Sequence, residues 1–124
     1  MNKQAGFTLI ELVMVIVIMG ILAAVAVPQF VDLSTEAQKS AQNAQAANLG
    51  SAVVMNYANE RLTNSGTSVT ACSDTVNLVI GYDAAKFGTP AGAFGGTPAL
   101  GDNTTCTITD PDGNVATFTG IYVP

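Results

Sequence analysis

The chain has 124 residues, and its four Lys and Arg residues against nine Asp and Glu residues give a net charge of −5. An acidic chain without a basic patch is a poor binder of nucleic acid, because phosphate neutralisation supplies most of that affinity. The sequence contains no histidine, the side chain used most often for acid–base chemistry and for binding transition metals. No nucleophile–base pair, phosphate loop or ligand cluster is visible, so we predict neither an enzyme nor a cofactor.

A long apolar segment begins near the N-terminus. An unbroken run of apolar or Gly residues extends from Leu12 to Val27, and Phe7, Leu9 and Ile10 lengthen it on the N-terminal side. A helix needs about 20 apolar residues to cross a bilayer. The segment therefore predicts a membrane-spanning helix.

Two ordinary interpretations of this segment stay open. One is a plain membrane anchor. The other is a secretory signal peptide, with Lys3 in its charged region and cleavage after Ala24-Val25-Ala26. Glu11 argues against the signal peptide because it lies where the apolar core should begin. Pro28 would also become the second residue of the product.

A third interpretation explains the polar residues. A short leader from Met1 to Gly6 ends directly before Phe7, and the chain continues as GFTLIEL and then VMVIVIMGILAAVAVP. Over about the first 35 residues this resembles the precursors of type IV pilins. The resemblance implies that a membrane-embedded prepilin peptidase removes residues 1–6 by cutting between Gly6 and Phe7, and then N-methylates Phe7.

Glu11 is the acid within this apolar segment. A carboxylate at the centre of a membrane helix costs on the order of 2.5–3.5 kcal/mol, and less near an end. Cleavage would create a partner, because Phe7 would then carry a free α-amino group one turn away. The resemblance implies that Glu11 instead pairs with that amine of a neighbouring subunit. A carboxylate that snorkels to the membrane surface is the alternative.

The helix is weakest between Gly20 and Pro28, since glycine lowers helix propensity and proline removes a backbone donor. We predict a continuous, gently kinked helix in the isolated subunit. The resemblance implies that this stretch loses helical order in a filament. Gly20 and Pro28 are therefore candidate assembly residues, together with Glu11.

Beyond Pro28 the helix becomes amphipathic. Small or apolar residues recur at helical spacing and predict the face that packs on the rest of the chain: Leu33, Ala37, Ala41, Ala44, Ala47, Val54, Ala58 and Leu62. The helix would run from Phe7 to about Leu62, or about 80 Å at 1.5 Å per residue. The polar sequence at 64–66 predicts its end.

The C-terminal region predicts a small sheet. Residues 76–82 (VNLVIGY) form one candidate strand, and residues 104–109 and 115–119 form a hairpin around Pro111-Asp112-Gly113. Residues 88–103 predict an irregular, exposed loop. The fold class is therefore α+β, a long N-terminal helix packed on a small antiparallel sheet of three to four strands, as in pilins.

Two features could stabilise this region. Cys72 and Cys106 in an exported chain predict one disulfide, worth roughly 3–4 kcal/mol, although a pair of free buried thiols stays open. Asp110, Asp112 and Asn114 are weak candidates for a calcium site, because their oxygens are suitable hard ligands. Gly113 comes too early for an EF-hand loop, and a hairpin turn is the favoured interpretation, so no metal is predicted.

The resemblance implies three parts: a leader (1–6), a membrane and filament-core half-helix (7–31), and a globular head (32–124). It implies a structural subunit that enters the inner membrane and polymerises with itself into a surface filament, or fimbrium, for adhesion, motility or DNA uptake. Its other partners would be the prepilin peptidase and the inner-membrane pilus assembly platform. The run PQFVDLSTEAQ is similar to the mannose-sensitive haemagglutinin subgroup, which favours attachment. The alternative is a pseudopilin of a type II secretion system, a periplasmic piston.

Overall fold

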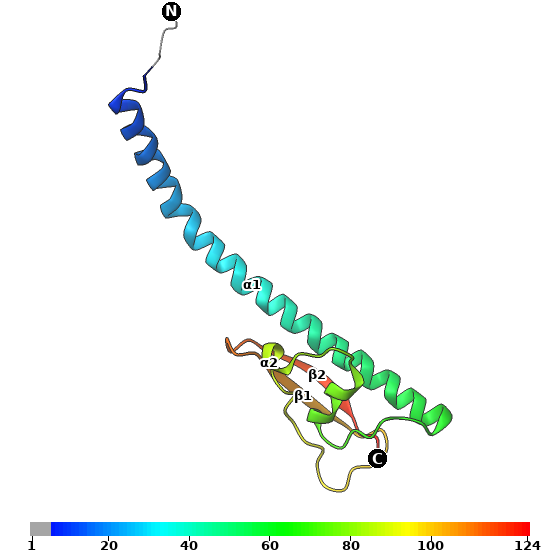
Figure 1. Cartoon of the computed structure of the whole chain (residues 1–124). Helices are drawn as coiled ribbons and strands as arrows, with labels where there is room; N and C mark the ends of the chain where they lie inside the picture. Colours follow the sequence, from blue (N-terminus) through cyan, green and yellow to red (C-terminus); the bar gives the residue numbers. More distant parts are fainter. Residues whose placement is uncertain (1–5) are drawn as a thin grey trace, which may run out of the picture. The chain divides into compact units, whose positions relative to one another are not determined.

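The structure is a computed structural model that describes residues 6–124 (Figure 1). The chain divides into two compact units, residues 1–36 and residues 37–124, and we call the second unit the head. The predicted leader, apart from Gly6, lies outside the described residues. The elements are α1 (Leu9–Thr63), the 3-10 helix η1 (Cys72–Leu78), α2 (Ala84–Phe87), β1 (Asn103–Thr109) and β2 (Val115–Ile121).

Helix α1 confirms the prediction of one long helix. It is 55 residues long and continues through Pro28. It ends where the polar sequence predicted, because Asn64 adopts a positive φ of 51° and its N–H donates to the carbonyl of Glu60 at 3.0 Å. The gentle kink near Pro28 stays a prediction.

The N-terminal half of α1 has no covering within its own unit. Every residue from 9 to 36 is exposed, and the helix is long and apolar enough to cross a membrane. A helix that is apolar on all sides is stable only inside a membrane or among other chains. This half therefore needs surroundings that the described residues of its own unit do not supply.

Strands β1 and β2 form the predicted hairpin. They pair antiparallel from Asn103 opposite Ile121 to Thr109 opposite Val115. Gly113 closes the turn with a φ of 86°, a conformation that favours glycine, and its N–H donates to the carbonyl of Asp110 at 3.0 Å.

The prediction of three to four strands is wrong for the part of the chain that is described, where the sheet has two strands. The segments beside the hairpin pair with it or with each other only through isolated bridges, Val69 with Val123, Ala71 with Ala93, and Ala91 with Thr107. Residues 88–103 are irregular as predicted, apart from these bridges.

The candidate strand at 76–82 is also wrong, because its first residues belong to η1. The Oδ2 of Asp74 accepts bonds from the backbone N–H groups of Thr70 and Ala71, both at 2.9 Å, and from the Thr70 hydroxyl at 3.0 Å. This cap fixes a tight helical turn before the β-branched residues begin. A local side-chain bond has thus overridden strand propensity.

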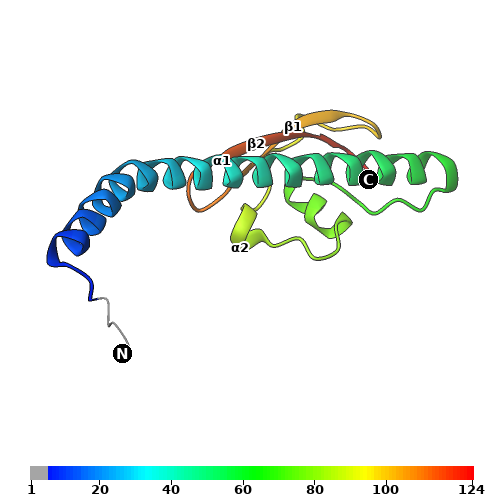
Figure 2. The same ribbon diagram turned by 90° about the horizontal axis from the view of Figure 1, so that it is seen from above.

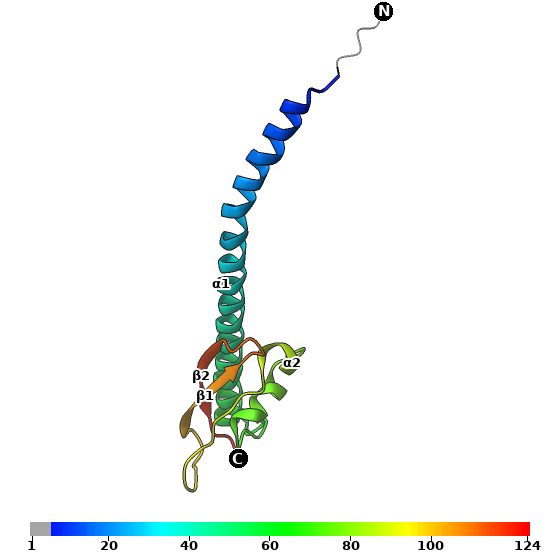
Figure 3. The ribbon, with the colours of Figure 1, turned by 90° about the vertical axis from the view of Figure 1, so that its left-hand side faces the viewer.

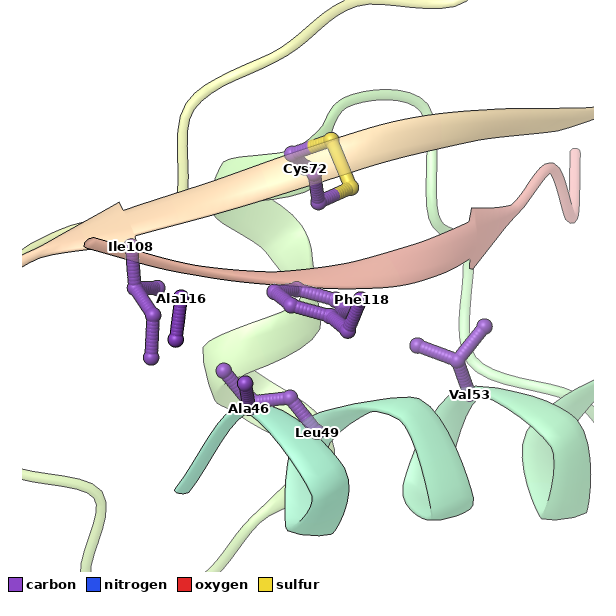
Figure 4. Close-up of a cluster of buried hydrophobic side chains, with 8 residues drawn as sticks. Ala46, Leu49, Val53, Cys72, Ile108, Ala116 and Phe118 are labelled. Carbon is purple, nitrogen blue, oxygen red and sulfur yellow. A yellow bond between two sulfur atoms is a disulfide. The ribbon is translucent and has the colours of Figure 1, made fainter. Parts of the chain in front are cut away.

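The core of the head lies between α1 and the inner face of the hairpin (Figure 4). Ile108, Ala116 and Phe118 point from the strands toward α1, where Ala46, Leu49 and Val53 meet them. Cys72 and Cys106 belong to the same buried cluster. The hairpin lies along one side of α1, and α2 lies on the other (Figure 2).

The predicted packing face of α1 is wrong by about half a turn of the helix, so the predicted stripe lies roughly opposite the buried one. The predicted stripe is exposed, and the buried residues of α1 are Gln42, Ala46, Leu49, Val53 and Asn56. The pattern of apolar residues did not predict this face because two of its buried residues, Gln42 and Asn56, are polar. Both are bonded, since Gln42 Nε2 donates to the Phe87 carbonyl at 2.9 Å and Asn56 exchanges two 2.7 Å bonds with the Thr67 backbone.

Candidate assembly site

The start of α1 is held by a reciprocal cap between Thr8 and Glu11. The Thr8 N–H and hydroxyl donate to Glu11 Oε2 at 2.9 and 2.7 Å, and the Glu11 N–H donates to the Thr8 hydroxyl at 3.4 Å. This is a capping box, with Thr at the N-cap and Glu three residues later. The sequence analysis missed the role of Thr8, although the Thr-x-x-Glu spacing was a sufficient signal.

Gly6 and Phe7 precede the helix. Both residues are non-helical and exposed, and the Phe7 side chain is 83% exposed. A side chain added at Gly6 would meet nothing within 4 Å. The peptide bond between these residues is therefore open to another molecule, while Glu11 lies one turn further along.

The other predicted assembly residues lie within α1. Gly20 is exposed and has open space around it, and Pro28 is accommodated inside the helix. The structure does not bring either residue together with Glu11, because they are separated along one helix. Their roles in assembly stay predictions.

The predicted disulfide joins Cys72 to Cys106, with a Cα–Cα distance of 5.6 Å. Two glycines that the sequence analysis did not single out make room for it. A Cβ at Gly92 would lie 2.8 Å from the Cys72 sulfur, and one at Gly120 would lie 2.6 Å from the Cys106 sulfur. The bridge ties the first residue of η1 to the middle of β1, and both cysteines are buried within the core cluster.

The head leaves one side of the hairpin open. Thr107 exchanges backbone bonds with Ala91, which lies on the other side of β1 from β2. In an antiparallel ladder its partner Thr117 must then direct its backbone N–H and carbonyl away from β1. Among the described residues no backbone group bonds this outer edge of β2, which Figure 3 shows at the margin of the head.

An uncharged groove lies next to this edge. It has a volume of about 580 Å³ and is lined by Ala47, Gly50, Ser51, Val54, Met55, Thr119 and Ile121. Val54 and Met55 are 56% and 68% exposed. Ala47 and Val54, two residues of the stripe that the sequence predicted as packed, therefore line an open surface that begins on α1 and reaches β2.

The weak metal candidates form the hairpin turn. Asp110 Oδ1 accepts the Asn114 N–H at 2.8 Å, and its Oδ2 accepts the Asn114 side-chain amide at 2.9 Å. The Asn114 side chain and backbone, with the N–H groups of Asp112 and Gly113, hold the pKa of Asp110 below its usual value. Residues 6–124 contain no group of three or more Asp, Glu, Cys or His side chains arranged for a metal.

Comparisons with known proteins agree with this geometry. Residues 1–27 match the family described as the prokaryotic N-terminal methylation motif. The chain is 60% identical over 50 residues to the type IV narrow pilus major component PilA5 of Thermus thermophilus, covering 40% of this chain and 43% of that protein. It is 42% identical over 81 residues to a fimbrial protein of Moraxella nonliquefaciens, covering 65% and 51%.

A third relative is the type IV major pilin protein PilE1 of Neisseria gonorrhoeae, 52% identical over 56 residues, or 45% of this chain and 34% of that protein. The chain thus spans about half the length of the first relatives it matches, and no solved structure matches it. The matched motif at residues 1–27 and these relatives show that the chain is similar to type IV pilins.

Proposed function

We propose that the chain is the major subunit of a type IV pilus, a structural protein that polymerises with itself into a surface filament. The observation that carries this proposal is the match of residues 1–27 to the methylation motif, which includes most of an apolar half-helix whose described residues are exposed. Polymerisation would cover this surface after the subunit leaves the membrane, as burial of apolar area requires.

Processing precedes assembly in this proposal. The prepilin peptidase cuts between Gly6 and Phe7 in the inner membrane and methylates the new N-terminus of Phe7. The exposed, non-helical backbone at these residues supports such a cut, because a protease needs an extended and accessible segment. The assembly platform of the inner membrane then transfers the subunit to the filament.

Glu11 sets the register of the polymer in this proposal. A charge among apolar helices is tolerated when a partner neutralises it, and the amine of a neighbour's Phe7 would do so. Among the described residues the carboxylate accepts its bonds from Thr8, so it has a local partner to exchange for that amine.

The head contributes a second contact surface. Its groove carries no charge and lies on the same helix as the apolar half, so neighbouring subunits could pack continuously along α1. Small residues such as Ala47, Gly50 and Ser51 would let a second backbone come close. The similarity of residues 28–38 to the mannose-sensitive haemagglutinin subgroup supports attachment as the use of the filament.

The test is the intact mass and N-terminal sequence of the chain in filaments sheared from the native cells. We expect a chain that starts at Phe7, one methyl group heavier and two hydrogens lighter than its sequence, in the sheared fraction. A start at Val27 would indicate an ordinary secreted protein and overturn the proposal. A processed chain confined to the cell envelope would indicate the pseudopilin of a type II secretion system.

A further inference from the structure

A small polar cavity lies at the end of the head that carries the β1–β2 turn. It has a volume of about 100 Å³ and is lined by Gln38, Ala41, Gln42, Lys86, Phe87, Asp110 and Asp112. It therefore joins the first turns of α1 within the head to the hairpin turn and to α2. Glu11, Gly20 and Pro28 do not line this cavity, and neither do the residues of the uncharged groove.

Gln42 presents a hydrogen-bond acceptor that lacks a donor at this cavity. The residue is 1% exposed, and its Nε2 donates to the Phe87 carbonyl at 2.9 Å. Its Oε1 is buried and has no partner among the described residues. A buried acceptor left without a donor destabilises the fold, so a donor brought to this site would be favoured.

The two carboxylates give the cavity a negative rim. The oxygens of Asp110 accept neutral donors from its own turn, mainly from Asn114, and no bond within residues 6–124 involves the Asp112 carboxylate. Lys86 lies on the same rim, but its Nζ is placed over the Phe87 ring, 5.2 Å from the centroid. Within the described chain neither carboxylate has an ion pair, so the cavity fits a cation that also donates hydrogen bonds.

The opposite end of the head carries such a group. The sequence has four Lys and Arg residues, and three of them (Lys39, Arg61 and Lys86) follow Phe7. Arg61 is exposed in the last turn of α1, and among the described residues nothing holds its guanidinium. It follows Gln42 by 19 positions, or about 28 Å of helix, and Figure 1 shows the β1–β2 turn and this end of α1 at opposite ends of the head.

We propose that Arg61 of one copy binds the cavity of Gln42, Asp110 and Asp112 on the next copy along the filament. A polymer needs a contact between two different surfaces of the subunit, because a self-complementary surface closes into a dimer. The two ends of the head form such a pair. The guanidinium offers five donors in a planar fork, enough for both carboxylates and the Gln42 oxygen.

This inference rests on the proposed function, because it needs copies that stack in one direction. It adds a specific contact between heads to the packing of the apolar helices. The contact would repeat at every subunit, so a modest energy per pair has a large effect on the polymer.

The experiment exchanges the charges in the native host and measures the chain in sheared filaments. We expect Arg61→Glu alone and Asp112→Arg alone to lower the sheared yield about fivefold, or roughly 1 kcal/mol per subunit. The double variant restores the yield to within about twofold of the parent. Asp110 is left intact because it holds the turn, and equal amounts of disulfide-bonded chain in the envelope show that each variant folds.

A matched control separates pairing from net charge. Arg61→Glu combined with Ser73→Arg and Asn77→Arg restores the net charge of the chain at two exposed positions on η1, and we expect no recovery. Single variants with parental yield, or equal recovery in this charge control, would overturn the inference and leave the proposed function standing. Loss with a chelator and with Asp112→Arg, but not with Arg61→Glu, would assign the cavity to a divalent cation instead. A parent chain absent from filaments would overturn the proposed function and this inference with it.

Discussion

The two halves of α1 differ in where they find their packing partners. Residues 9–36 are exposed on every side, and Glu11 and Asp32 are among the few charges in a mostly apolar surface. Residues 37–63 bury one narrow stripe against the hairpin, and Leu49 at its centre is fully buried. One continuous helix therefore serves a head that completes its own core and a half-helix that does not.

This difference separates two kinds of stability. The fold of the head depends on contacts within one chain, which a substitution in the core or at the disulfide should weaken. The first half of α1 depends on contacts with a membrane or other copies, so substitutions there should change assembly and leave the head folded. The following predictions test this separation.

The largest effect is expected at the disulfide. Replacing Cys72 and Cys106 together by Ser should lower the free energy of unfolding of the head by about 2–5 kcal/mol, because the open chain gains entropy when unfolded. Urea unfolding of the full chain in detergent measures this. The parent treated with a thiol reductant is the control and should match the variant. An unchanged midpoint in the variant would contradict the dependence of this thin core on its bridge.

Core packing should come next. Leu49→Ala removes a fully buried side chain and should lower the free energy of unfolding by about 2–5 kcal/mol. The matched change Val54→Ala lies on the same helix, is 56% exposed, and should cost less than about 0.5 kcal/mol. The same urea titration compares them. If Val54→Ala lowers the free energy of unfolding as much as Leu49→Ala does, Val54 would be part of the packing face, as the sequence predicted. That result would contradict the observed face, in which Val54 is exposed.

Glu11 should affect assembly without affecting the head. Glu11→Ala should reduce the chain in sheared filaments at least about tenfold, equivalent to roughly 1.4 kcal/mol per subunit, because the neighbour's amine loses its partner. Asp32→Ala removes another exposed acid from the same half of α1 and is the control. Equal loss in both variants, or a lower melting temperature of the head in Glu11→Ala, would break the proposed separation.

The smallest effect concerns Asp74 and acid. Burial acts to raise the pKa of Asp74, but bonds from the Thr70 and Ala71 backbones and the Thr70 hydroxyl outweigh it, so the pKa lies below the ordinary 3.8. A carboxyl with a lowered folded pKa stabilises the head above about pH 3.8. That contribution is lost as the pH falls through the folded pKa.

The measurement for Asp74 is urea unfolding of the head between pH 5 and pH 2, a range chosen to span about two units around the ordinary pKa. Asp74→Asn should be less stable than the parent at pH 5, and the difference should shrink toward pH 2. Asp83→Asn, which removes the charge but keeps an N-cap oxygen for the short helix α2, is the control. If the difference in the free energy of unfolding between the parent and Asp74→Asn is constant over this range, the charge of Asp74 does not contribute to the stability of the head.

Local signals in the sequence predicted much of this molecule. The apolar run, the turn at Gly113 and the two cysteines act over short stretches or by simple chemistry, and α1, the hairpin and the disulfide followed from them. The packing face of α1 did not, because Gln42 and Asn56 are buried through bonds to Phe87 and Thr67, which are distant in the sequence. Such partners are visible only in the folded chain.

The missed 3-10 helix and the missed cavity have the same physical origin. Residues 76–82 have the composition of a strand, but the preceding cap at Asp74 sets the path of the backbone before they begin. The cavity brings Gln42 and Asp112 together from distant segments. Neither juxtaposition has a periodic signal in the sequence.

The capping box at Thr8 bears on the timing of assembly. If the subunit waits in the membrane as proposed, the Glu11 carboxylate needs a partner there, and the N–H and hydroxyl of Thr8, three residues earlier in the same chain, supply one. A cap of this kind is worth about 1 kcal/mol. That energy acts as a threshold, because an incoming amine must exceed it before the carboxylate exchanges partners. The cap would thus keep the Glu11 carboxylate bonded within its own chain until a correctly aligned copy supplies the amine. Weaker contacts with misaligned copies would not displace it.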